Sequence, residues 1–434
     1  MLKNIAFAVS LFLFSPMFVI GEVPKELDAY LALPDESFRW EVLEKSETAT
    51  ERTFLIDLTS QTWHGIPWKH FVLVAVPSRI TNPNHAVLVI AGSSTGRKPS
   101  NNDKLLVRGL AEASGMCTAV LLQVPNQPLL GDYREDALIG ETLLKTLETK
   151  DATWPLLFPM TKSAIRAMDA VQEVLKKEKQ FEIGGFIVTG ASKRGWTTWL
   201  TAASGDKRVV AIAPMVIDTL NIRQQMKYQL ETWGTHSPSI HDYTDRNLIQ
   251  LDDSQASEFE KNLWTMIDPY SYRSRLTMPK LLIHGTNDPY WALDAAKFYF
   301  DDLPGVKYIL TLPNVGHNLG GQQIKGVQTA AVFARKAARG DAWPTVKWKL
   351  VENDAEYRIN VETDLTLRGV KLWTAPSETK DFRQAKWTSA MQDPKTAFSV
   401  PISKPGAGHV AFFVELESVD AGLPFSLTTQ VWRF

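Results

Sequence analysis

A serine in a glycine-bounded turn is the strongest chemical signal in the sequence. The string Val188-Thr-Gly-Ala-Ser-Lys-Arg-Gly195 places Ser192 between an apolar run that predicts a buried strand and a segment that predicts a helix. A sharp turn of this kind lifts a serine hydroxyl above the edge of a sheet, and glycines relieve the backbone crowding there. The usual pattern is Gly-x-Ser-x-Gly, whereas here Arg194 takes the second glycine position and Gly195 follows it. On its own, the turn fits either a nucleophile or an ordinary loop serine.

Two later strand ends carry the residues that could activate this serine. The apolar run Leu281–His284 leads into Gly-Thr-Asn-Asp, so Asp288 follows a predicted buried strand. The apolar run Val306–Leu312 leads into Pro-Asn-Val-Gly-His, so His317 follows the last such strand before the C-terminal region. The chain order serine, acid, histidine is that of α/β-hydrolases and differs from the orders in chymotrypsin and subtilisin. We therefore predict that Ser192, Asp288 and His317 form one catalytic triad.

The three side chains would act together on an acyl group. A serine hydroxyl is a weak nucleophile at neutral pH until a base accepts its proton, and imidazole titrates close to that pH. Asp288 would fix the tautomer of His317 and stabilise its charged form. The oxyanion needs two donors, and we expect the backbone N–H of Lys193 and a group from Ser93 or Ser94 in the loop after the first buried strand. The predicted reaction is cleavage of an ester or amide through an acyl-enzyme.

Other polar residues compete for these roles. Asp218 also follows an apolar run, where some hydrolases place the acid, and Asp268 is a weaker alternative. His236 and His241 stand in polar surroundings, where a histidine is more often exposed than functional. His284 lies inside a predicted strand and is expected to be a hydrogen-bonded core residue. The sequence leaves Asp218 open as an alternative acid.

Cofactor-binding patterns are weak in this sequence. The stretch 92–98 vaguely resembles a phosphate loop, but its spacing is one residue short and Pro99 follows the lysine. No spacing of histidines, cysteines or carboxylates typical of a metal site occurs. Lys193 and Arg194, at the start of a predicted helix, could meet an anionic substrate group or could be surface charges. We therefore expect no metal and no other cofactor, and we assign no substrate-binding residue.

The elements that must position these residues alternate between strands and helices. Continuous apolar runs predict buried strands, and apolar residues at helical spacing predict helices. The expected strands are 53–58, 70–76, 85–91, 117–124, 186–189, 209–216, 280–284 and 306–312. The expected helices are 104–114, 162–178, 196–203, 294–300 and 324–339. After an antiparallel first pair, this alternation predicts an α/β-hydrolase fold with a mainly parallel, helix-covered sheet.

Two regions depart from this alternation of strands and helices. Residues from about 219 to 279 are too many for a simple crossover, and we expect a partly helical lid over the strand ends. After Asp341, strand candidates spaced by turn residues predict a β-sandwich-like domain; they are 345–351, 356–361, 369–373, 398–400, 409–417 and 426–432. The predicted organisation is a signal peptide at 1–21, an α/β-hydrolase domain with its lid at 22–340, and the β-sandwich-like domain at 341–434.

The N-terminus and the composition bear on compartment and partners. Lys3, the apolar run Ile5–Ile20 and the small Gly21 have the layout of a secretory signal peptide, which predicts export to a periplasm or beyond. The run is short for a spanning helix and Pro16 interrupts it, so we expect cleavage rather than an anchor. Cys117 is the single cysteine, so no intramolecular disulfide is possible. A net charge of -1 predicts a small-molecule or peptide substrate and no nucleic acid.

Several of these strings resemble one family. The runs Gly190–Ala203, Arg208–Asp218, His284–Trp291 and Pro313–Leu319 look like those of PhoPQ-activated pathogenicity-related proteins. The resemblance extends over nearly all of the chain after the signal segment, and it implies an exported protein with an α/β-hydrolase-like fold. The family name describes regulation and not a reaction, so no substrate comes with it. The serine turn also resembles that of glucuronoyl esterases, in which an arginine stands where this sequence has Lys193.

The residues thus predict an exported serine hydrolase. One alternative is a serine peptidase of the same fold, in which the lid and the β-domain shape a cleft for a peptide. A second alternative is a secreted binding or signalling protein that keeps the hydrolase scaffold without catalysis. The presence of Ser192, Asp288 and His317 together speaks against the second alternative.

Overall fold

The computed structural model describes residues 22–178, 181–252, 254 and 256–434 of the 434-residue chain. The segment predicted as a signal peptide, 1–21, lies outside the described residues. Within the described part, no helix combines the length and the apolar character that crossing a membrane requires.

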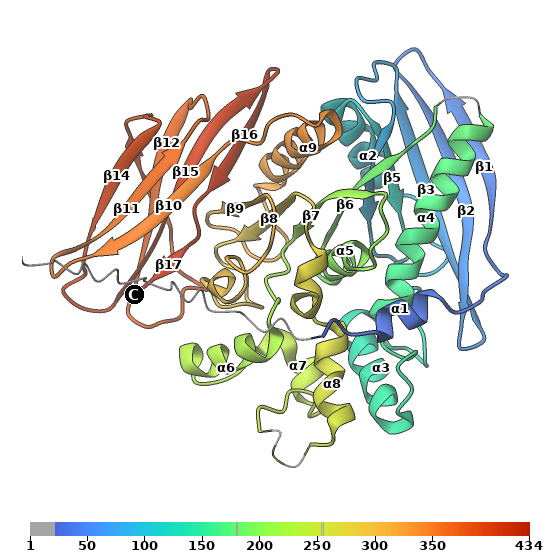
Figure 1. Ribbon diagram of the computed structural model, residues 1–434, viewed down its shortest axis with the longest axis horizontal. Coiled ribbons are helices and arrows are strands. Elements are labelled where there is room, and N and C mark those ends of the chain that lie inside the picture. The colour runs from blue at the N-terminus through green and yellow to red at the C-terminus, as the bar shows by residue number, and fades with distance from the viewer. Residues whose placement is uncertain (1–21, 179–180, 253, 255) are drawn as a thin grey trace, which may run out of the picture.

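One large sheet connects the N-terminal and C-terminal halves of the molecule (Figure 1). Its centre is parallel, and the strands follow in the spatial order β5 (Cys117–Leu121), β4 (His85–Ile90), β6 (Gly185–Ala191), β7 (Val209–Met215), β8 (Lys280–Gly285) and β9 (Lys307–Leu312). On the β5 side the sheet continues antiparallel through β3 (Ile66–Pro77), β2 (Glu51–Trp63) and β1 (Arg39–Glu47). The carboxyl ends of β6, β8 and β9 therefore meet at one edge of the sheet.

Helices cover both faces of this parallel centre. They are α4 (Leu157–Lys177) and α5 (Lys193–Ala203) on one face, and α2 (Asn101–Ser114) and α9 (Gln323–Arg339) on the other. Alternate residues of a strand point to opposite faces, so Leu88 of β4 packs into the α4 and α5 core while Val87 packs into the α2 and α9 core. This two-sided burial explains why the central strands are continuous apolar runs.

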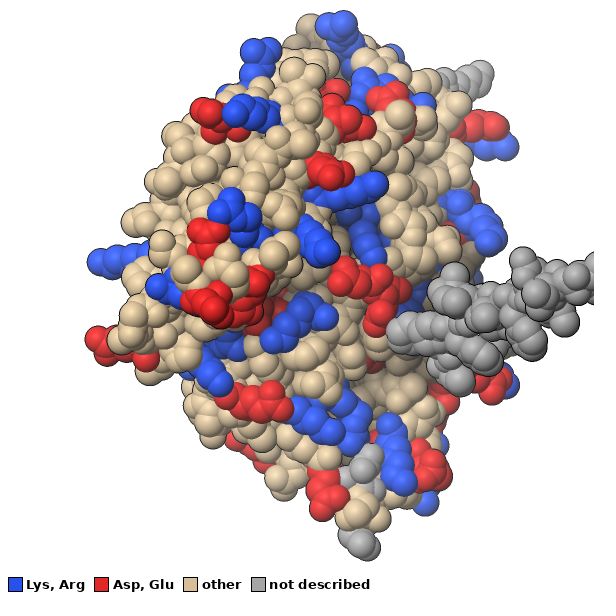
Figure 2. Space-filling view, turned by 60° about the vertical axis from the view of Figure 1, so that its left-hand side comes forward, with Lys and Arg blue, Asp and Glu red and all other residues tan. Residues whose placement is uncertain are grey.

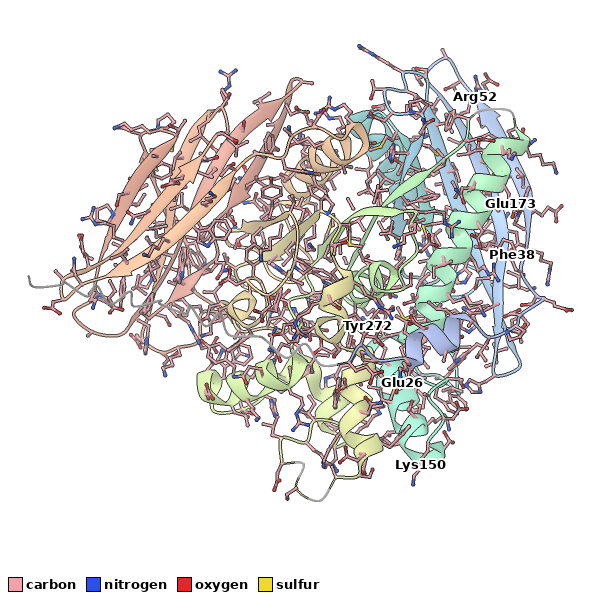
Figure 3. The ribbon with its side chains drawn as sticks, in the orientation of Figure 1. Glu26, Phe38, Arg52, Lys150, Glu173 and Tyr272 are labelled. Carbon is pink, nitrogen blue, oxygen red and sulfur yellow. The ribbon has the colours of Figure 1, made fainter. Side chains whose placement is uncertain are left out.

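The N-terminal strands pack against α4. Trp40 of β1 donates a hydrogen bond from its indole N–H to Glu173 Oε2 at 2.5 Å, and the Arg166 guanidinium lies 4.8 Å from the centre of the Phe38 ring. Figure 3 labels Glu173 and Phe38 in this interface. Strand β1 was not predicted from the sequence, because most of its side chains are exposed and many are charged, so that it shows no apolar pattern.

The C-terminal region is an antiparallel β structure with two layers. One layer consists of β10 (Val346–Glu352), β11 (Glu356–Thr363) and β14 (Ala397–Ser403). The other consists of β12 (Gly369–Ser377), β13 (Thr388–Gln392), β15 (His409–Asp420), β16 (Leu423–Thr428) and β17 (Trp432–Arg433). This second layer continues the central sheet, because Thr428 of β16 pairs with Ile309 of β9. Buried residues of both layers, such as Ile359 and Val414, share the α2 and α9 core.

Helices between the central strands gather beside the carboxyl end of the sheet, at the bottom of Figure 1. Between β7 and β8 lie α6 (Ile222–Trp233), α7 (His241–Thr244) and α8 (Glu258–Ile267), with short 3-10 turns at Pro238–Ile240 and Pro269–Arg275. Between β5 and β6, α3 (Glu135–Thr149) packs against α7 and α8. The short α1 (Glu26–Leu31) contacts α4 and α8.

The predicted fold class is confirmed: a largely parallel central sheet covered by helices, with an antiparallel β region at the C-terminus. Two details of the prediction are wrong. The single strand expected at 426–432 is divided between β16 and β17, which both pair with β15 on either side of an irregular stretch. The helix expected at 294–300 is a short 3-10 turn, Ala295–Phe298.

Candidate active site

Ser192 occupies a strained turn between β6 and α5. Its backbone has φ 58° and ψ -128°, a conformation that residues with a Cβ rarely adopt. The Ser192 N–H donates to the Met215 carbonyl of the neighbouring strand at 2.9 Å, which holds the turn at the edge of the sheet. Backbone strain of this kind at a single serine is typical of a nucleophile elbow.

Two glycines make room for this turn. A Cβ on Gly190 would lie 2.6 Å from the Arg194 carbonyl oxygen, and a Cβ on Gly195 would lie 2.6 Å from Ile217 Cγ2 and 3.0 Å from the Gly190 carbonyl oxygen. Contacts shorter than 3.0 Å do not occur at real Cβ atoms, so both positions require glycine. The displaced second glycine of the motif therefore has a physical reason: the close approach falls three residues after the serine instead of two.

A chain of hydrogen bonds links Ser192 to His317 and Asp288. His317 Nε2 lies 2.8 Å from Ser192 Oγ, and His317 Nδ1 lies 2.8 Å from Asp288 Oδ2. A carboxylate only accepts, so the neutral ring carries its proton on Nδ1 and Nε2 accepts from the serine hydroxyl. The Asp288 side chain is 6% exposed and that of His317 is 23% exposed, so the acid is buried while the base borders solvent. The structure thus brings together the three residues that the sequence singled out.

The loops after β8 and β9 are joined by hydrogen bonds, which explains why acid and base meet. The Asn287 N–H donates to the Val315 carbonyl at 3.0 Å, and the Asn314 N–H donates to Thr286 Oγ1 at 2.9 Å. A Cβ on Gly285 would lie 2.5 Å from the same Val315 oxygen, so only glycine permits this approach.

The C-terminal β region supports these two loops from behind. Asn314 Nδ2 donates to the Trp387 carbonyl at 3.0 Å, and the Trp387 N–H donates back to Asn314 Oδ1 at 2.8 Å. Asn287 Nδ2 donates to the Ala385 carbonyl at 2.8 Å. Neither contact was visible in the sequence, because nothing in the spacing indicates that residues about seventy to a hundred positions later reach these loops.

The two alternative acids have other partners. Asp218 Oδ1 accepts from the Tyr299 hydroxyl at 2.6 Å, and burial raises the pKa of its carboxyl. Asp268 accepts from the backbone N–H groups of Ile222 at 2.8 Å and Tyr270 at 2.9 Å, so it caps helical turns. Burial raises the pKa of Asp268 to about 6 although these N–H groups oppose the shift. Neither carboxylate is hydrogen-bonded to His317, whose Nδ1 is already bonded to Asp288.

The other histidines that the sequence singled out are not hydrogen-bonded to Ser192, which contacts the ring of His317. His241 is exposed and its Nδ1 bonds to the Pro238 carbonyl at 3.1 Å. His236 is partly buried, and burial lowers its pKa. His284 was expected to be a hydrogen-bonded core residue, but neither of its ring nitrogens has a hydrogen-bond partner among the described residues. That expectation was wrong; His284 instead lines a small polar cavity beside Asp218.

Lys193 and Arg194 are buried and paired inside the protein. Arg194 Nη2 and Nη1 donate to the two Glu135 carboxylate oxygens at 2.8 and 2.6 Å, and Lys193 Nζ lies 2.8 Å from Glu135 Oε2 and 3.1 Å from Asp136 Oδ2. Burial alone would raise the pKa of Glu135, but the two cations hold it well below its ordinary value. Neither of the two cations is therefore a surface charge. Glu135 and Asp136 were not predicted from the sequence, in which they look like ordinary acidic residues of a first helical turn.

The residues expected at the oxyanion site lie as follows. Lys193 is the first residue of α5, where a backbone N–H has no intrahelical acceptor. The loop after β4 lies close to the start of α5, since the Arg194 guanidinium occupies the place that a Cβ on Gly92 would take. Ser93 Oγ is buried and has no partner within the described part of the chain, whereas Ser94 Oγ accepts from Arg134 Nη1 at 2.9 Å.

Ser192 borders two cavities of different character. On the side of α6 to α8, a narrow cavity of about 40 Å³ is lined mainly by apolar and aromatic residues, among them Trp196, Trp264 and Tyr290. On the side of α2 and α9, a cavity of about 420 Å³ includes both Ser192 and His317 in its lining. The Tyr290 ring also packs 4.3 Å from the His317 ring, centre to centre. Ser192 thus lies between an aromatic wall on one side and an aliphatic space on the other.

The surface charge gives no sign of a polyanionic or polycationic partner on the face that Figure 2 shows. Basic and acidic side chains are intermixed over that face, in keeping with a net charge of -1. Among the described residues, no group of three or more His, Cys, Asp or Glu side chains is placed to hold a metal ion.

The chain is similar in sequence to a known protein family and to a known protein. The model of the family described as PhoPQ-activated pathogenicity-related protein matches residues 27–383. The autocrine proliferation repressor protein A of Dictyostelium discoideum is 31% identical over 447 residues, which cover 93% of this chain and 89% of that protein.

Among solved structures, acetyl xylan esterase 1 from Thermoanaerobacterium sp. JW/SL YS485 has a TM-score of 0.51 and 15% identity, covering 71% of this chain and 94% of that one. Acetyl xylan esterase from Paenibacillus sp. R4 has a TM-score of 0.48 and 15% identity, covering 68% and 87%. At these identities the structural likeness concerns the fold, which is that of α/β-hydrolase esterases.

Proposed function

The chain belongs to the PhoPQ-activated pathogenicity-related protein family, and we propose that it is a serine hydrolase that cleaves an ester or amide through an acyl-enzyme. Ser192 is the nucleophile, His317 the base and Asp288 the acid that orients it. The observation that carries this proposal is the continuous line of two 2.8 Å hydrogen bonds from the Asp288 carboxylate through His317 to a serine in a strained turn. The α/β-hydrolase fold supports it as well.

In the proposed first step, Ser192 Oγ attacks the substrate carbonyl carbon while its proton moves to His317 Nε2. The imidazolium then stands 2.8 Å from the buried Asp288 carboxylate, which stabilises its charge without taking up the proton. His317 passes the proton to the leaving alcohol or amine as the acyl–oxygen or acyl–nitrogen bond breaks. A water molecule, deprotonated by the same imidazole, then releases the acid from Ser192.

We place the oxyanion of each tetrahedral intermediate between the Lys193 N–H and the loop that carries Gly92, Ser93 and Ser94. The unpaired N–H at the start of α5 and the partial positive charge of a helix N-terminus support this placement. The ion pairs of Arg194 and Lys193 with Glu135 hold α5 and α3 together beneath it. Removal of one oxyanion donor typically costs about 10²–10³ in rate.

Purified wild-type protein and Ser192→Ala, assayed on p-nitrophenyl esters and on aminoacyl p-nitroanilides, test the proposal. We expect ester hydrolysis by the wild type and none above background by Ser192→Ala. Hydrolysis of the anilides but not the esters would favour the peptidase alternative. Equal activity of wild type and variant would place the reaction elsewhere.

We also propose that the protein is exported, on the strength of the signal-like segment 1–21. N-terminal sequencing of the protein recovered outside the cytoplasm would be expected to begin near Glu22. Recovery in the cytoplasm with an intact N-terminus would contradict export.

A second candidate function is extracellular signalling, favoured by the name of the Dictyostelium relative, which is an autocrine proliferation repressor. In that case the fold would serve recognition, and catalysis would be dispensable. Adding wild-type protein or Ser192→Ala to growing cells separates the two. Equal repression of growth by both would support signalling without catalysis, whereas repression by the wild type alone would tie the effect to hydrolysis.

A further inference from the structure

The cavity of about 420 Å³ lies between the sheet and the helix pair α2 and α9. Its floor is the face of β4, β6 and β7, its roof is formed by the two helices, and Ser192 and His317 belong to its lining. The aliphatic side chains that line it include Val87, Val89, Leu106, Leu110, Ile187 and Val327. It is an apolar space that opens directly at the proposed reacting groups.

The cavity exists because small side chains stand where large ones would fill a core. Ala330 and Ala334 of α9 and Ala213 of β7 face it, and each is buried. Protein interiors are close-packed, with few voids larger than a water molecule. Val89 and Met215, on central strands, nevertheless remain partly exposed. An unfilled apolar space of this size next to a nucleophile is the form of a binding site and not of a packed core.

Each helix of the pair also carries an exposed apolar residue near its start. Leu105 in the second turn of α2 is 66% exposed, and Ile324 in the first turn of α9 is 74% exposed. Both helices begin at the carboxyl edge of the sheet, since α2 follows β4 and α9 follows β9. Leu106 and Val327, beside these two residues, are half-buried and line the cavity. Exposed apolar side chains thus stand next to cavity-lining residues at the start of both helices.

We propose that this cavity is the acyl subsite and that the protein prefers esters of unbranched aliphatic acids of medium length. This inference rests on the proposed function. An engineered apolar cavity of about 150 Å³ holds one benzene molecule, so the present cavity has room for on the order of ten carbon atoms. The apolar lining offers no hydrogen-bond partner for a sugar or a peptide backbone along most of its length.

The reaction assigns each part of the ester to one side of Ser192. The acyl chain enters the cavity, Ser192 Oγ bonds to its carbonyl carbon, and the bond from that carbon to the alcohol oxygen breaks. The alcohol takes the serine proton from His317 and leaves past the aromatic wall of Trp264 and Tyr290. Water then restores the serine and releases the aliphatic acid, so the step needs no other reactant.

The first test is the dependence of rate on acyl length. We expect kcat/KM for p-nitrophenyl esters to rise from acetate to octanoate by about fourfold per buried methylene over the first few carbons. In Ala330→Leu and Ala334→Leu the added side chain fills the cavity, so the ratio of octanoate to acetate hydrolysis should fall at least about tenfold. Ala338→Leu, on the same helix but outside the lining, is the matched control and should keep the wild-type profile. A wild type that prefers acetate, or filling variants that slow both esters equally, would overturn the proposal.

The second test does not depend on catalysis. Decanoic acid should raise the melting temperature of Ser192→Ala, acetate should not, and the added Ala330→Leu substitution should abolish the shift. If the wild type hydrolyses no ester but Ser192→Ala binds decanoic acid in this way, the subsite stands and the proposed function fails. If esters are cleaved but decanoic acid does not bind, the subsite fails and the proposed function stands. A decanoylated glycerol and a decanoylated sugar, assayed side by side, then distinguish a lipid source of the chain from a carbohydrate source.

Discussion

The described part of the chain contains two serine–histidine pairs of nearly equal geometry, in two different regions. In the proposed site, Ser192 Oγ lies 2.8 Å from His317 Nε2, and the Nδ1 of that ring meets an oxygen at 2.8 Å. In the N-terminal strands, Ser60 Oγ lies 3.0 Å from His70 Nε2, and the Nδ1 of that ring meets an oxygen at 2.9 Å. The distances alone do not show which of the two serines is the nucleophile.

The partners beyond the rings differ. The oxygen at His317 is the carboxylate of Asp288, which stabilises an imidazolium, whereas the oxygen at His70 is the backbone carbonyl of Leu122, which bears no full charge. Burial lowers the pKa of His70 to about 4, against the opposing effect of that carbonyl, so this ring stays neutral at neutral pH. A histidine that resists protonation is a poor acceptor for a serine proton.

Access and backbone strain differ as well. Ser60 and His70 are buried within β2 and β3, and Ser60 Oγ also contacts Ser163 Oγ at 3.0 Å. Ser192 borders two cavities and has a positive φ of 58°. The contact between a serine and a histidine is therefore not what makes a nucleophile. A carboxylate behind the ring, an open side and a turn that exposes the hydroxyl are the features that separate the two regions.

The largest expected effect is that of removing the base. His317→Ala should lower kcat for the preferred ester by about 10⁶, as loss of a triad base does elsewhere. His70→Asn keeps a donor toward the Leu122 carbonyl and should leave kcat/KM within about tenfold of wild type. Steady-state kinetics on p-nitrophenyl esters, with circular dichroism to verify folding, measure both. A comparable loss in the two folded variants would remove the distinction between the regions.

The next largest effect on kcat distinguishes Asp288 from Asp218, two buried carboxylates at neighbouring strand ends. Asp288→Asn should lower kcat by about 10⁴, because an amide cannot stabilise the imidazolium and favours the wrong ring tautomer. Asp218→Asn should change it by less than about tenfold, since an amide oxygen can still accept from Tyr299. If Asp218→Asn proves the more damaging, the acid has been misassigned.

The proximity of the three candidate residues could be predicted from the sequence, because local pattern and chain order coincide there. Ser192, Asp288 and His317 each follow a buried strand, so their meeting at one sheet edge follows from parallel topology. The Glu135 ion pairs could not be predicted in this way. That contact depends on how α3 returns to α5 across 59 residues, and no periodicity encodes such a distance.

The same limit applies to the fold. Continuous apolar runs predicted the central strands because both of their faces are buried. The exposed strands β1 and β13 carry no such pattern, and both were missed. The continuation of the sheet into the C-terminal region depends on a single pairing, Thr428 with Ile309, which neither strand signals locally.

A smaller loss of rate is expected from adding a methyl group to Gly195, in the turn after Ser192. Gly195→Ala places a Cβ 2.6 Å from Ile217 Cγ2, so the turn must shift, and misplacement of a reacting group by about 1 Å can cost about 10² in rate. Gly184→Ala is the matched control, because its Cβ would meet its nearest neighbour at 3.8 Å. Ester kinetics of the two variants check this, and a fully active Gly195→Ala would show that the close approach is not required.

The smallest effect concerns stability and acts through His70. Its pKa is about 4 in the folded protein and near 6.5 in an unfolded chain. At pH values between these two, the unfolded state therefore binds more protons than the folded state. The free energy of unfolding should therefore decrease as pH falls below 6.5, by about 2 kcal/mol at pH 5 from this group. Urea titrations at pH 7 and pH 5 should show this loss in the wild type and a smaller one in His70→Asn. An equal loss in both proteins would assign the acid sensitivity to other groups.

The central claim is that Ser192, and not any other serine, is activated by its neighbours. Treatment with a fluorophosphonate followed by peptide mass mapping tests this directly. We predict one adduct, on Ser192, absent from Ser192→Ala and strongly reduced in His317→Ala, with Ser60 unmodified. A folded wild type that stays unlabelled, or an adduct on another serine, would contradict the account.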